Sequence, residues 1–273
     1  MTEFTSKDLT VLYEDNHVIV VVKPCNIPSQ GDDSNDKDML TVVKEYIKEK
    51  YNKPGEAYVG LVHRLDRPTG GVMVFAKTSK AAARLSEDIR NGNFEKKYLC
   101  VTCGVPNQKQ GELKHYLKKN QAKNTVQIVP QATDGAKLAV LDYSFVQEVK
   151  GFSLFKIQLH TGRSHQIRVQ MASIGLPLFG DSKYGADPRT FRHNLGLWAT
   201  EIKFKHPVSN ETMTFIVHPP KDEVPWRAFD ISRILNVGIV PNPYDDLANF
   251  NVLQDKTKAL IKEENKESKD AKK

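Results

Sequence analysis

Alternating and continuous apolar runs near the start of the chain predict a pair of strands followed by a helix. Residues 10–23 alternate and then become continuously apolar, as is typical of two short strands that meet at a turn around residues 14–16. Residues 39–51 carry apolar side chains at helical spacing, among them Val43 and Ile47. The Lys-Pro-Gly sequence at 53–55 ends that helix.

The next segment predicts a strand, a loop, a second strand and a helix. Residues 60–78 contain two apolar runs separated by the Pro-Thr-Gly-Gly sequence at 68–71. Residues 79–92 have the pattern of an amphipathic helix, with Ser79 as the N-cap and Gly92 at the C-terminal end.

The second half of the chain is richer in strands. Residues 96–160 alternate over long stretches, with turns expected at Gly111 and at 134–135. A helical pattern then runs from residue 162 to Gly175, and residues 197–220 contain a further strand pair.

Strands outnumber helices and do not alternate regularly with them, so the pattern predicts an α+β fold with a mixed, mainly antiparallel sheet and flanking helices. We expect one domain over residues 1–220 and an extension over 221–255 that packs on or near it. We expect the Lys- and Glu-rich residues 256–273 to be a disordered tail.

The net positive charge favours a polyanionic partner but does not by itself establish one. The 273 residues carry a formal net charge of +7. Residues 256–273 hold seven Lys against four acids, a net of +3, which leaves +4 for residues 1–255. A modest basic excess is also typical of an ordinary solvated surface.

Hydropathy argues against a membrane protein. The mean hydropathy is -0.49, and no apolar run approaches the ~20 residues that span a bilayer. The first residues have neither an apolar signal core nor a basic leader, so we expect a cytoplasmic protein.

The three cysteines do not indicate a metal site. Cys100 and Cys103 lie in a predicted strand, where residues three apart point to opposite faces, and Cys25 is distant in sequence. We expect free thiols and no bound metal.

Two segments combine charge with glycine. The first is His63-Arg64-Leu65-Asp66-Arg67-Pro68-Thr69-Gly70-Gly71, in which Arg64 and Asp66 would share one face of an extended backbone. The Arg64 guanidinium could then hold the carboxylate in its ionised form.

The second segment is Thr161-Gly162-Arg163-Ser164-His165-Gln166-Ile167-Arg168, at a predicted junction of strand and helix. A helix N-terminus favours anions, and Arg163 and Arg168 lie too far apart to bind one small group. We expect one arginine to bind a phosphate and the other to meet a buried partner. Each segment alone is also typical of a surface ion pair or a capped helix.

Four ordered motifs resemble those of the RluA-like (ribosomal large subunit type) pseudouridine synthases. HRLDRPTGG is similar to the H-R-L-D-x-x-T-S-G motif of that family, and FEKKYLCVTCG to its K-x-Y-x-A-x-V-x-G strand. LHTGRSHQIRVQMASIGLPLFGDSKYG resembles its T-G-R-T-H-Q-I-R-V-H segment and the glycine-aspartate turn that follows. VLYEDNHVIVVVKP resembles its opening strand and Lys-Pro turn, so the likeness extends over roughly residues 10–220.

The resemblance implies the pseudouridine synthase catalytic fold with a central RNA-binding cleft, and a role for individual residues. Asp66 corresponds to the essential aspartate, Tyr98 to the tyrosine that stacks on the target base, and Arg168 to the arginine paired with the aspartate. Ile167 resembles the aliphatic residue that packs against the uracil, and Arg64 the arginine that replaces the flipped nucleotide. We expect weaker RNA contacts from a group of neighbours, namely His63, Lys96, Arg163, His165 and Gln166.

Four positions depart from the pattern of the family. Gly70 stands for the usual serine, Cys100 for an alanine, Gln170 for a histidine and Trp198 for the histidine of an L-H-A sequence. None of them touches the aspartate, so they bear on loop geometry and substrate choice.

The implied chemistry suits these residue types. Conversion of uridine to pseudouridine breaks the bond between N1 and C1′, rotates the uracil and rejoins it through C5, with no net redox change. We therefore expect no cofactor, and no nucleotide-binding or zinc motif is found in the sequence. A carboxylate such as Asp66 can act as a nucleophile at C1′ or as a base at C2′. The target base must leave its helix to react, which favours a uridine in a loop.

Two other functions fit parts of the sequence. A hydrolase of nucleosides or phosphate esters could use Asp66 with a histidine and would release free uracil or phosphate. A non-catalytic RNA-binding protein of the same fold would bind RNA without converting uridine, although such proteins are expected to lose the aspartate first.

Binding of RNA is expected to involve the groove and a lysine-rich stretch. Many family members carry a small S4-type RNA-binding domain before the catalytic one, and we expect none here. Lysines gather instead within 106–140, where we single out Lys118 and Lys119, although a solvated hairpin would show the same charges. We expect ribosomal RNA as substrate ahead of transfer RNA, no membrane association and a monomer.

Overall fold

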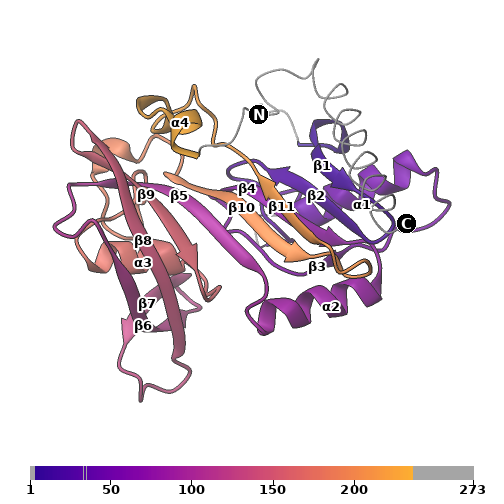
Figure 1. The fold of residues 1–273 in the computed structure, drawn as a ribbon, viewed down its shortest axis with the longest axis horizontal. Coiled ribbons are helices and arrows are strands. Elements are labelled where there is room, and N and C mark those ends of the chain that lie inside the picture. Colours follow the sequence, from indigo (N-terminus) through magenta and orange to yellow (C-terminus); the bar gives the residue numbers. More distant parts are fainter. Residues whose placement is uncertain (1–3, 33, 35, 236–273) are drawn as a thin grey trace, which may run out of the picture.

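The computed structural model describes residues 4–32, 34 and 36–235, and in this part the chain folds around a mixed sheet of eleven strands. The strands follow the spatial order β1-β2-β4-β10-β5-β9-β8-β6-β7, with β3 beside β4 and β11 beside β10 (Figure 1). Their bounds are β1 Thr10–Glu14, β2 Val18–Lys23, β3 Gly60–Leu61, β4 Gly70–Ala76, β5 Glu95–Cys103, β6 Gln110–Asn120, β7 Thr125–Val129, β8 Lys137–Val149, β9 Phe152–Leu159, β10 Leu197–Lys205 and β11 Thr212–Ile216. The pairing of β10 with β4 is parallel, and the other pairings are antiparallel. The α+β prediction is therefore confirmed.

Four α-helices flank this sheet in the described part of the chain, and two apolar clusters separate them from it. The helices are α1 Met39–Lys50, α2 Ser79–Arg90, α3 Gln166–Ser173 and α4 Ile231–Leu235. Buried side chains of α1 and α3, such as Ile47 and Met171, belong to one cluster. Leu85 of α2 and Trp226 belong to the other. Side chains alternate across a strand, so the two clusters lie on opposite faces of the sheet.

Local signals predicted most element boundaries, with two corrections. The N-cap of α2 is Thr78, whose hydroxyl accepts a hydrogen bond from Ala81 N at 3.1 Å, so the prediction of Ser79 was wrong by one residue. Both residues are good N-caps, and a boundary of one residue is not resolved by pattern. The turn predicted at Gly111 was wrong: Gly111 lies within β6 and pairs with Tyr143 of β8, whose hydroxyl lies 3.1 Å from where a Cβ on Gly111 would be.

The packed body continues past Pro220. Trp226 is 1% exposed, and Phe229 and Ile231 are buried in the same cluster. The first part of the 221–255 extension thus packs on the sheet. The remainder of that extension and the predicted tail at 256–273 lie outside the described residues.

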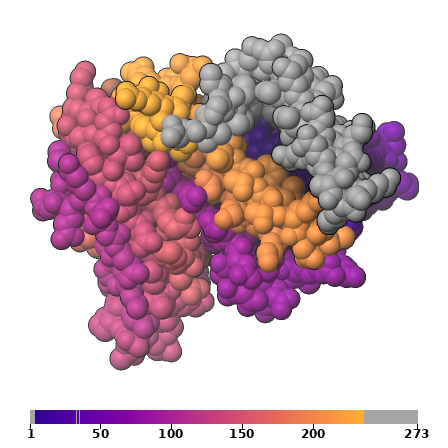
Figure 2. All heavy atoms as spheres, in the orientation of Figure 1, coloured from indigo at the N-terminus to yellow at the C-terminus, as the bar shows by residue number. Residues whose placement is uncertain are grey.

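The space-filling view shows how the two halves of the sheet differ in shape. Strands β6, β7 and β8 form a projecting arm, and a notch separates it from the surface of α2 (Figure 2). No helix in the described ranges is long and apolar enough to cross a bilayer. Within these same ranges, no three His, Cys, Asp or Glu side chains are grouped as metal ligands.

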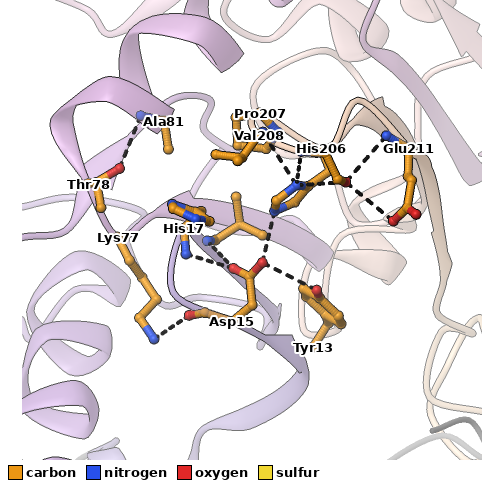
Figure 3. A network of polar contacts seen from close by, with 12 residues as sticks. Tyr13, Asp15, His17, Lys77, Thr78, Ala81, His206, Pro207, Val208 and Glu211 are labelled. Atoms are coloured by element: carbon orange, nitrogen blue, oxygen red, sulfur yellow. Dashed lines mark hydrogen bonds and ion pairs between the residues drawn. The ribbon is translucent and has the colours of Figure 1, made fainter. Parts of the chain in front are cut away.

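The half-buried Asp15 side chain joins the β1–β2 turn to the turn between β10 and β11 (Figure 3). Asp15 Oδ1 accepts hydrogen bonds from the backbone N–H groups of His17 and Val18, each at 2.7 Å. Its Oδ2 lies 2.8 Å from Nε2 of His206 in the turn between β10 and β11. The Lys77 ammonium just before α2 donates to the Asp15 carbonyl oxygen at 2.5 Å. The network therefore fixes the β1–β2 turn against both neighbours.

Asp15→Ala is expected to lower the free energy of unfolding at pH 7 by about 1–3 kcal/mol, because two backbone N–H groups lose their acceptor. Urea unfolding measures this change. Asp142→Ala is the matched control, since Asp142 also pairs with a histidine, His160, but the two side chains are 49% and 47% exposed. An exposed pair contributes at most about 1 kcal/mol. Equal losses in the two variants would contradict the account.

The effect of Asp15→Ala should also depend on pH. Burial raises the pKa of Asp15, but the hydrogen bonds from Val18 and His17 and the contact with His206 outweigh it, so its pKa lies below the ordinary 3.8. A depressed pKa contributes stability that is present above 3.8 and is lost as the pH falls through the folded-state value. The difference in the free energy of unfolding between wild type and Asp15→Ala should therefore become smaller as the pH falls through that range.

Candidate active site

Asp66 lies in the loop between β3 and β4, and buried polar groups hold this loop from behind. The Ser29 hydroxyl donates to Leu65 O at 2.8 Å and accepts from Leu65 N at 3.1 Å. The Lys23 side chain is fully buried, and its ammonium donates to Arg67 O at 3.0 Å. Burial lowers the pKa of Lys23 to about 7, against the opposing influence of Cys25 and Asp66. The loop is thus fixed on both sides of Asp66.

The backbone after the loop approaches β10 very closely. Gly70 and Gly71 pair with Trp198 and Ala199 in the parallel register of β4 and β10. Gly71 has a φ of +127°, and a Cβ there would lie 2.6 Å from Ala199 N. Glycine is therefore required at 71 both by conformation and by space.

Asp66, Tyr98, Ile167 and Arg168 line one cavity of about 550 Å³. Tyr98 comes from β5, while Ile167 and Arg168 come from the first turn of α3. Tyr98 is 7% exposed, and burial followed by the charge of Asp66 raises the pKa of its phenol. The sequence-predicted group is therefore brought together around an ionisable carboxylate and a neutral aromatic ring.

One arginine of the second segment meets a buried partner, as predicted, while the binding of a phosphate by the other stays a prediction. Arg168 is 5% exposed and lies between two carboxylates, with Nη1 3.9 Å from Asp66 Oδ2 and Nη2 2.7 Å from Asp181 Oδ1. Arg163 is exposed, and its Nε donates to Leu138 O at 2.8 Å. Arg168 thus has the buried partner, and Arg163 lies at the cavity wall.

The expectation that Arg64 holds Asp66 was wrong. In the described part of the chain, the ion pair of Asp66 is with Arg168, and Arg64 is exposed and forms no ion pair. The argument from alternation fails because residues 62–69 are not a strand, and the backbone turns so that Thr69 N donates to Asp66 O at 2.9 Å. Arg64 still lines the cavity.

His63 lines the same cavity, but its ring is held by the protein. Nε2 accepts from Val74 N at 3.1 Å, and the ring packs against Phe94 with centroids 5.3 Å apart. Burial, with a smaller effect of Lys96, lowers the pKa of His63 to about 3. His63 is therefore neutral at physiological pH and brings no charge to an RNA contact.

The side chains of Gln166 and His165 also bond to other groups of the protein. The Gln166 amide accepts from Thr161 Oγ1 and Arg163 N and donates to Val140 O, at 2.8, 3.0 and 3.0 Å. The side chain is buried and bonded within the protein, but Gln166 still lines the cavity, so its contact with RNA stays a prediction. His165 has a φ of +50°, and its Nδ1 lies 2.7 Å from the Tyr184 hydroxyl. Burial lowers the pKa of His165, although Asp66 opposes the shift.

A second cavity, of about 830 Å³, adjoins the first at Asp66, Arg64 and Arg168. Lys119 at the end of β6 lines it, whereas the neighbouring Lys118 does not. Cationic side chains outnumber carboxylates around both cavities. The first has Arg64, Arg90, Lys96, Arg163 and Arg168 against Asp66, and the second has Arg64, Arg67, Lys119, Arg168, Lys183 and Arg192 against Asp32 and Asp66.

Several of these residues were missed by sequence reasoning. Lys183 and Arg192 belong to the loop that follows α3, and Arg90 ends α2. Tertiary packing brings these residues to the cavities at Asp66, and a local sequence pattern does not predict such long-range contacts. Asp181 lies in the glycine-aspartate turn singled out in the sequence, Gly-Asp-Ser-Lys-Tyr-Gly at 180–185, and the aspartate in that turn was the available signal.

Comparison with known proteins gives one consistent result. Residues 17–173 match the sequence profile of the family described as RNA pseudouridylate synthase. Ribosomal large subunit pseudouridine synthase D of Pasteurella multocida is 32% identical over 228 residues, which cover 81% of this chain and 67% of that protein. Ribosomal large subunit pseudouridine synthase D of Haemophilus influenzae is 31% identical, with 79% and 69% covered.

Solved structures show the same fold. Human RNA Pseudouridylate Synthase Domain Containing 4 superposes with a TM-score of 0.66 at 23% identity and covers 79% of this chain and 91% of its own. Human RNA Pseudouridylate Synthase Domain Containing 1 gives a TM-score of 0.64 at 21% identity, with 81% and 87% covered.

Two positions that depart from the motif pattern, Gly70 and Trp198, lie in contact. A Cβ on Gly70 would lie 2.8 Å from Cε3 of Trp198, closer still to Cζ3 of that ring, and 3.1 Å from Sγ of Cys25. The buried indole of Trp198, which donates to Val217 O at 3.1 Å, thus fills the space of the serine side chain usual at 70. A smaller ring at 198 would leave room for that serine.

The other two departures are packing changes away from Asp66. Cys100 is fully buried, and burial raises the pKa of its thiol. Gln170 Nε2 lies 3.0 Å from both Leu113 O and His115 Nδ1, so it joins α3 to β6. Neither residue lines the cavity at Asp66.

Gly70→Ser is expected to destabilise the protein by about 1–3 kcal/mol through overpacking against the indole. Trp198→His alone should also cost stability, because it empties buried volume. In the double variant the two losses should be less than additive by about 1–3 kcal/mol, since serine fills the space that the ring vacates. Denaturant unfolding of all four proteins measures this coupling, and simple additivity would contradict the contact.

Proposed function

We propose, on the premise that the chain belongs to the RNA pseudouridylate synthase family and is an isomerase, that Asp66 carries the conversion of uridine to pseudouridine without a cofactor. The observation that carries this proposal is the position of Asp66. Its side chain is 20% exposed at the wall shared by two cationic cavities, with Arg168 beside it. An accessible carboxylate with a cation nearby suits either a nucleophile at C1′ or a base at C2′.

Asp66 is assigned the bond changes at the ribose. Cleavage between N1 and C1′ frees the uracil, which rotates and forms a new bond from C5 to C1′. The hydrogen on C5 then leaves as a proton, and N1 is protonated. All atoms are conserved except for exchange of these protons with solvent, so the reaction requires no oxidant or reductant.

Tyr98 and Ile167 are assigned to the detached base. Both side chains are buried and line the cavity from two different elements, β5 and α3. Stacking of a base on an aromatic ring contributes about 1–3 kcal/mol, which offsets part of the cost of drawing the nucleotide out of its helix. A dry slot also keeps water from C1′ while the bond is broken.

Strand binding is assigned to the cations that line the two cavities. An RNA strand whose target nucleotide enters the first cavity would continue into the second, because the two share a wall at Asp66. Phosphates along that path would meet Lys96 and Arg163 on one side and Lys119 and Arg192 on the other. Relatives named ribosomal large subunit pseudouridine synthase D support ribosomal RNA as the substrate class.

Asp66→Asn is expected to lower conversion by at least about 10²-fold while RNA binding is kept, because the carboxamide has the same shape but cannot ionise. The substrate is large-subunit ribosomal RNA transcribed in vitro with uridine tritiated at C5. Each conversion releases the C5 hydrogen to water, so released tritium counts events. Asp134→Asn, in an exposed turn, is the control that should behave as wild type.

Three outcomes would count against the proposal. Tritium recovered in free uracil would indicate a hydrolase, and wild-type activity in Asp66→Asn would remove Asp66 from the chemistry. Binding without any release would favour the non-catalytic RNA-binding alternative.

Lys119→Glu is expected to weaken RNA binding and to lower the slope of log affinity against log salt by about 0.7–0.9 for each phosphate that the lysine neutralises in the wild-type complex. Lys118→Glu is the matched control. It makes the same charge change one residue earlier in β6, outside the second cavity, and should have the smaller effect. Affinities measured at a series of salt concentrations test this, and equal slopes in the two variants would contradict the proposed path.

A further inference from the structure

Asp181 holds Arg168 through both of the donors on one edge of its guanidinium. Arg168 Nε donates to Asp181 Oδ2 and Nη2 donates to Oδ1, each at 2.7 Å. The Asp181 side chain is fully buried and Arg168 nearly so. Short, parallel, charge-assisted bonds of this kind fix both the position and the plane of a guanidinium.

This arrangement decides which donor is left for Asp66. The edge formed by Nε and Nη2 is occupied, so Nη1 is the nitrogen that faces the Asp66 carboxylate, 3.9 Å from its Oδ2. A distance of 3.9 Å is too long for a hydrogen bond, so Asp66 keeps its oxygens available. Asp66 and Arg168 alone would pair edge to edge, as arginine and carboxylate usually do.

The face of the guanidinium is held as well. The Arg168 Cζ lies 5.1 Å from the centre of the Tyr184 ring, within the range of a cation–π contact. The Tyr184 hydroxyl accepts from Val126 N at 2.8 Å and lies 2.7 Å from His165 Nδ1. The ring therefore cannot move without breaking contacts to two other elements.

The turn that carries Asp181 is itself rigid. Gly180 has a φ of +77°, and a Cβ there would lie 2.8 Å from Asn194 O. Gly180 N donates to Thr190 Oγ1 at 3.1 Å, and Ala186 N donates to Asp181 O at 3.2 Å. The carboxylate is thus presented from a fixed backbone.

We infer that Asp181 is a positioning residue for the isomerisation, which occupies one edge of Arg168 so that this arginine orients Asp66 without closing an ion pair upon it. The inference rests on the proposed role of Asp66. Asp181 itself lines neither of the cavities at Asp66, so it acts through Arg168 and not on the RNA.

Asp181→Asn tests the inference with the tritiated ribosomal RNA described above. An asparagine offers one oxygen in place of two, so Arg168 is free to turn toward Asp66. A displacement of about 1 Å at a reacting group can lower a rate by about 10²-fold. We expect kcat to fall by about 10²-fold while KM changes by less than about threefold, with rates expressed per folded molecule from circular dichroism.

Asp187→Asn is the matched control, since Asp187 is six residues further along the same segment and pairs with Arg189, which is 90% exposed. It should retain the kcat of wild type. A purely structural role for Asp181 would lower the folded fraction and leave kcat per folded molecule unchanged. That result would overturn the inference.

Arg168→Lys covers the case in which Asp181→Asn does not fold. The lysine keeps a positive charge next to Asp181, so no buried charge is left alone, but one ammonium cannot both replace the fork and face Asp66. We expect a folded protein with a similar loss of kcat, and wild-type kcat in this variant would overturn the inference. Inactive wild-type protein would instead refute the proposed function on which the inference rests.

Discussion

The site depends on one arginine that must serve two carboxylates. Arg168 is buried, so its charge requires a partner inside the protein, and Asp181 supplies it with two bonds of 2.7 Å. With Nε and Nη2 bound to Asp181, the remaining nitrogen, Nη1, lies 3.9 Å from Asp66 Oδ2. The geometry of this one guanidinium therefore constrains how α3 and the turn that carries Asp181 lie relative to each other. This constraint connects the fold to the chemistry of the site.

A second constraint acts on the backbone that carries Asp66. Lys23 and Ser29 bind the loop from behind, and Gly71 lets β4 lie against β10 without a side chain between them. Gly70 and Trp198 show how the same close approach can be satisfied by another pair of residues. The motif can vary at positions 70 and 198 because the two side chains share one space. Neither change contacts Asp66.

Much of the fold could be predicted from pattern, because α1 and α2 each bury one apolar face and β2 is a continuously apolar strand buried on both faces. The grouping of Asp66, Tyr98, Ile167 and Arg168 followed from resemblance. Contacts between distant segments could not be predicted in this way. Alternation placed Arg64 against Asp66, but alternation holds only in a strand, and this segment turns. Gln166 was expected to contact RNA, and the bond of its amide to Val140 O could not be predicted from the sequence. Asp181 lies in a motif that was singled out in the sequence, but its partner Arg168 could be identified only from the structure, in which α3 lies beside that turn.

We propose that this centre isomerises uridine in ribosomal RNA of the organism that encodes it. Carbodiimide adducts mark pseudouridine as stops in reverse transcription, so the modified positions of total RNA can be mapped with and without the gene. The account predicts that one or a few positions in ribosomal RNA lose their adduct when the gene is removed and regain it when the gene is restored. An identical map in both strains would contradict it.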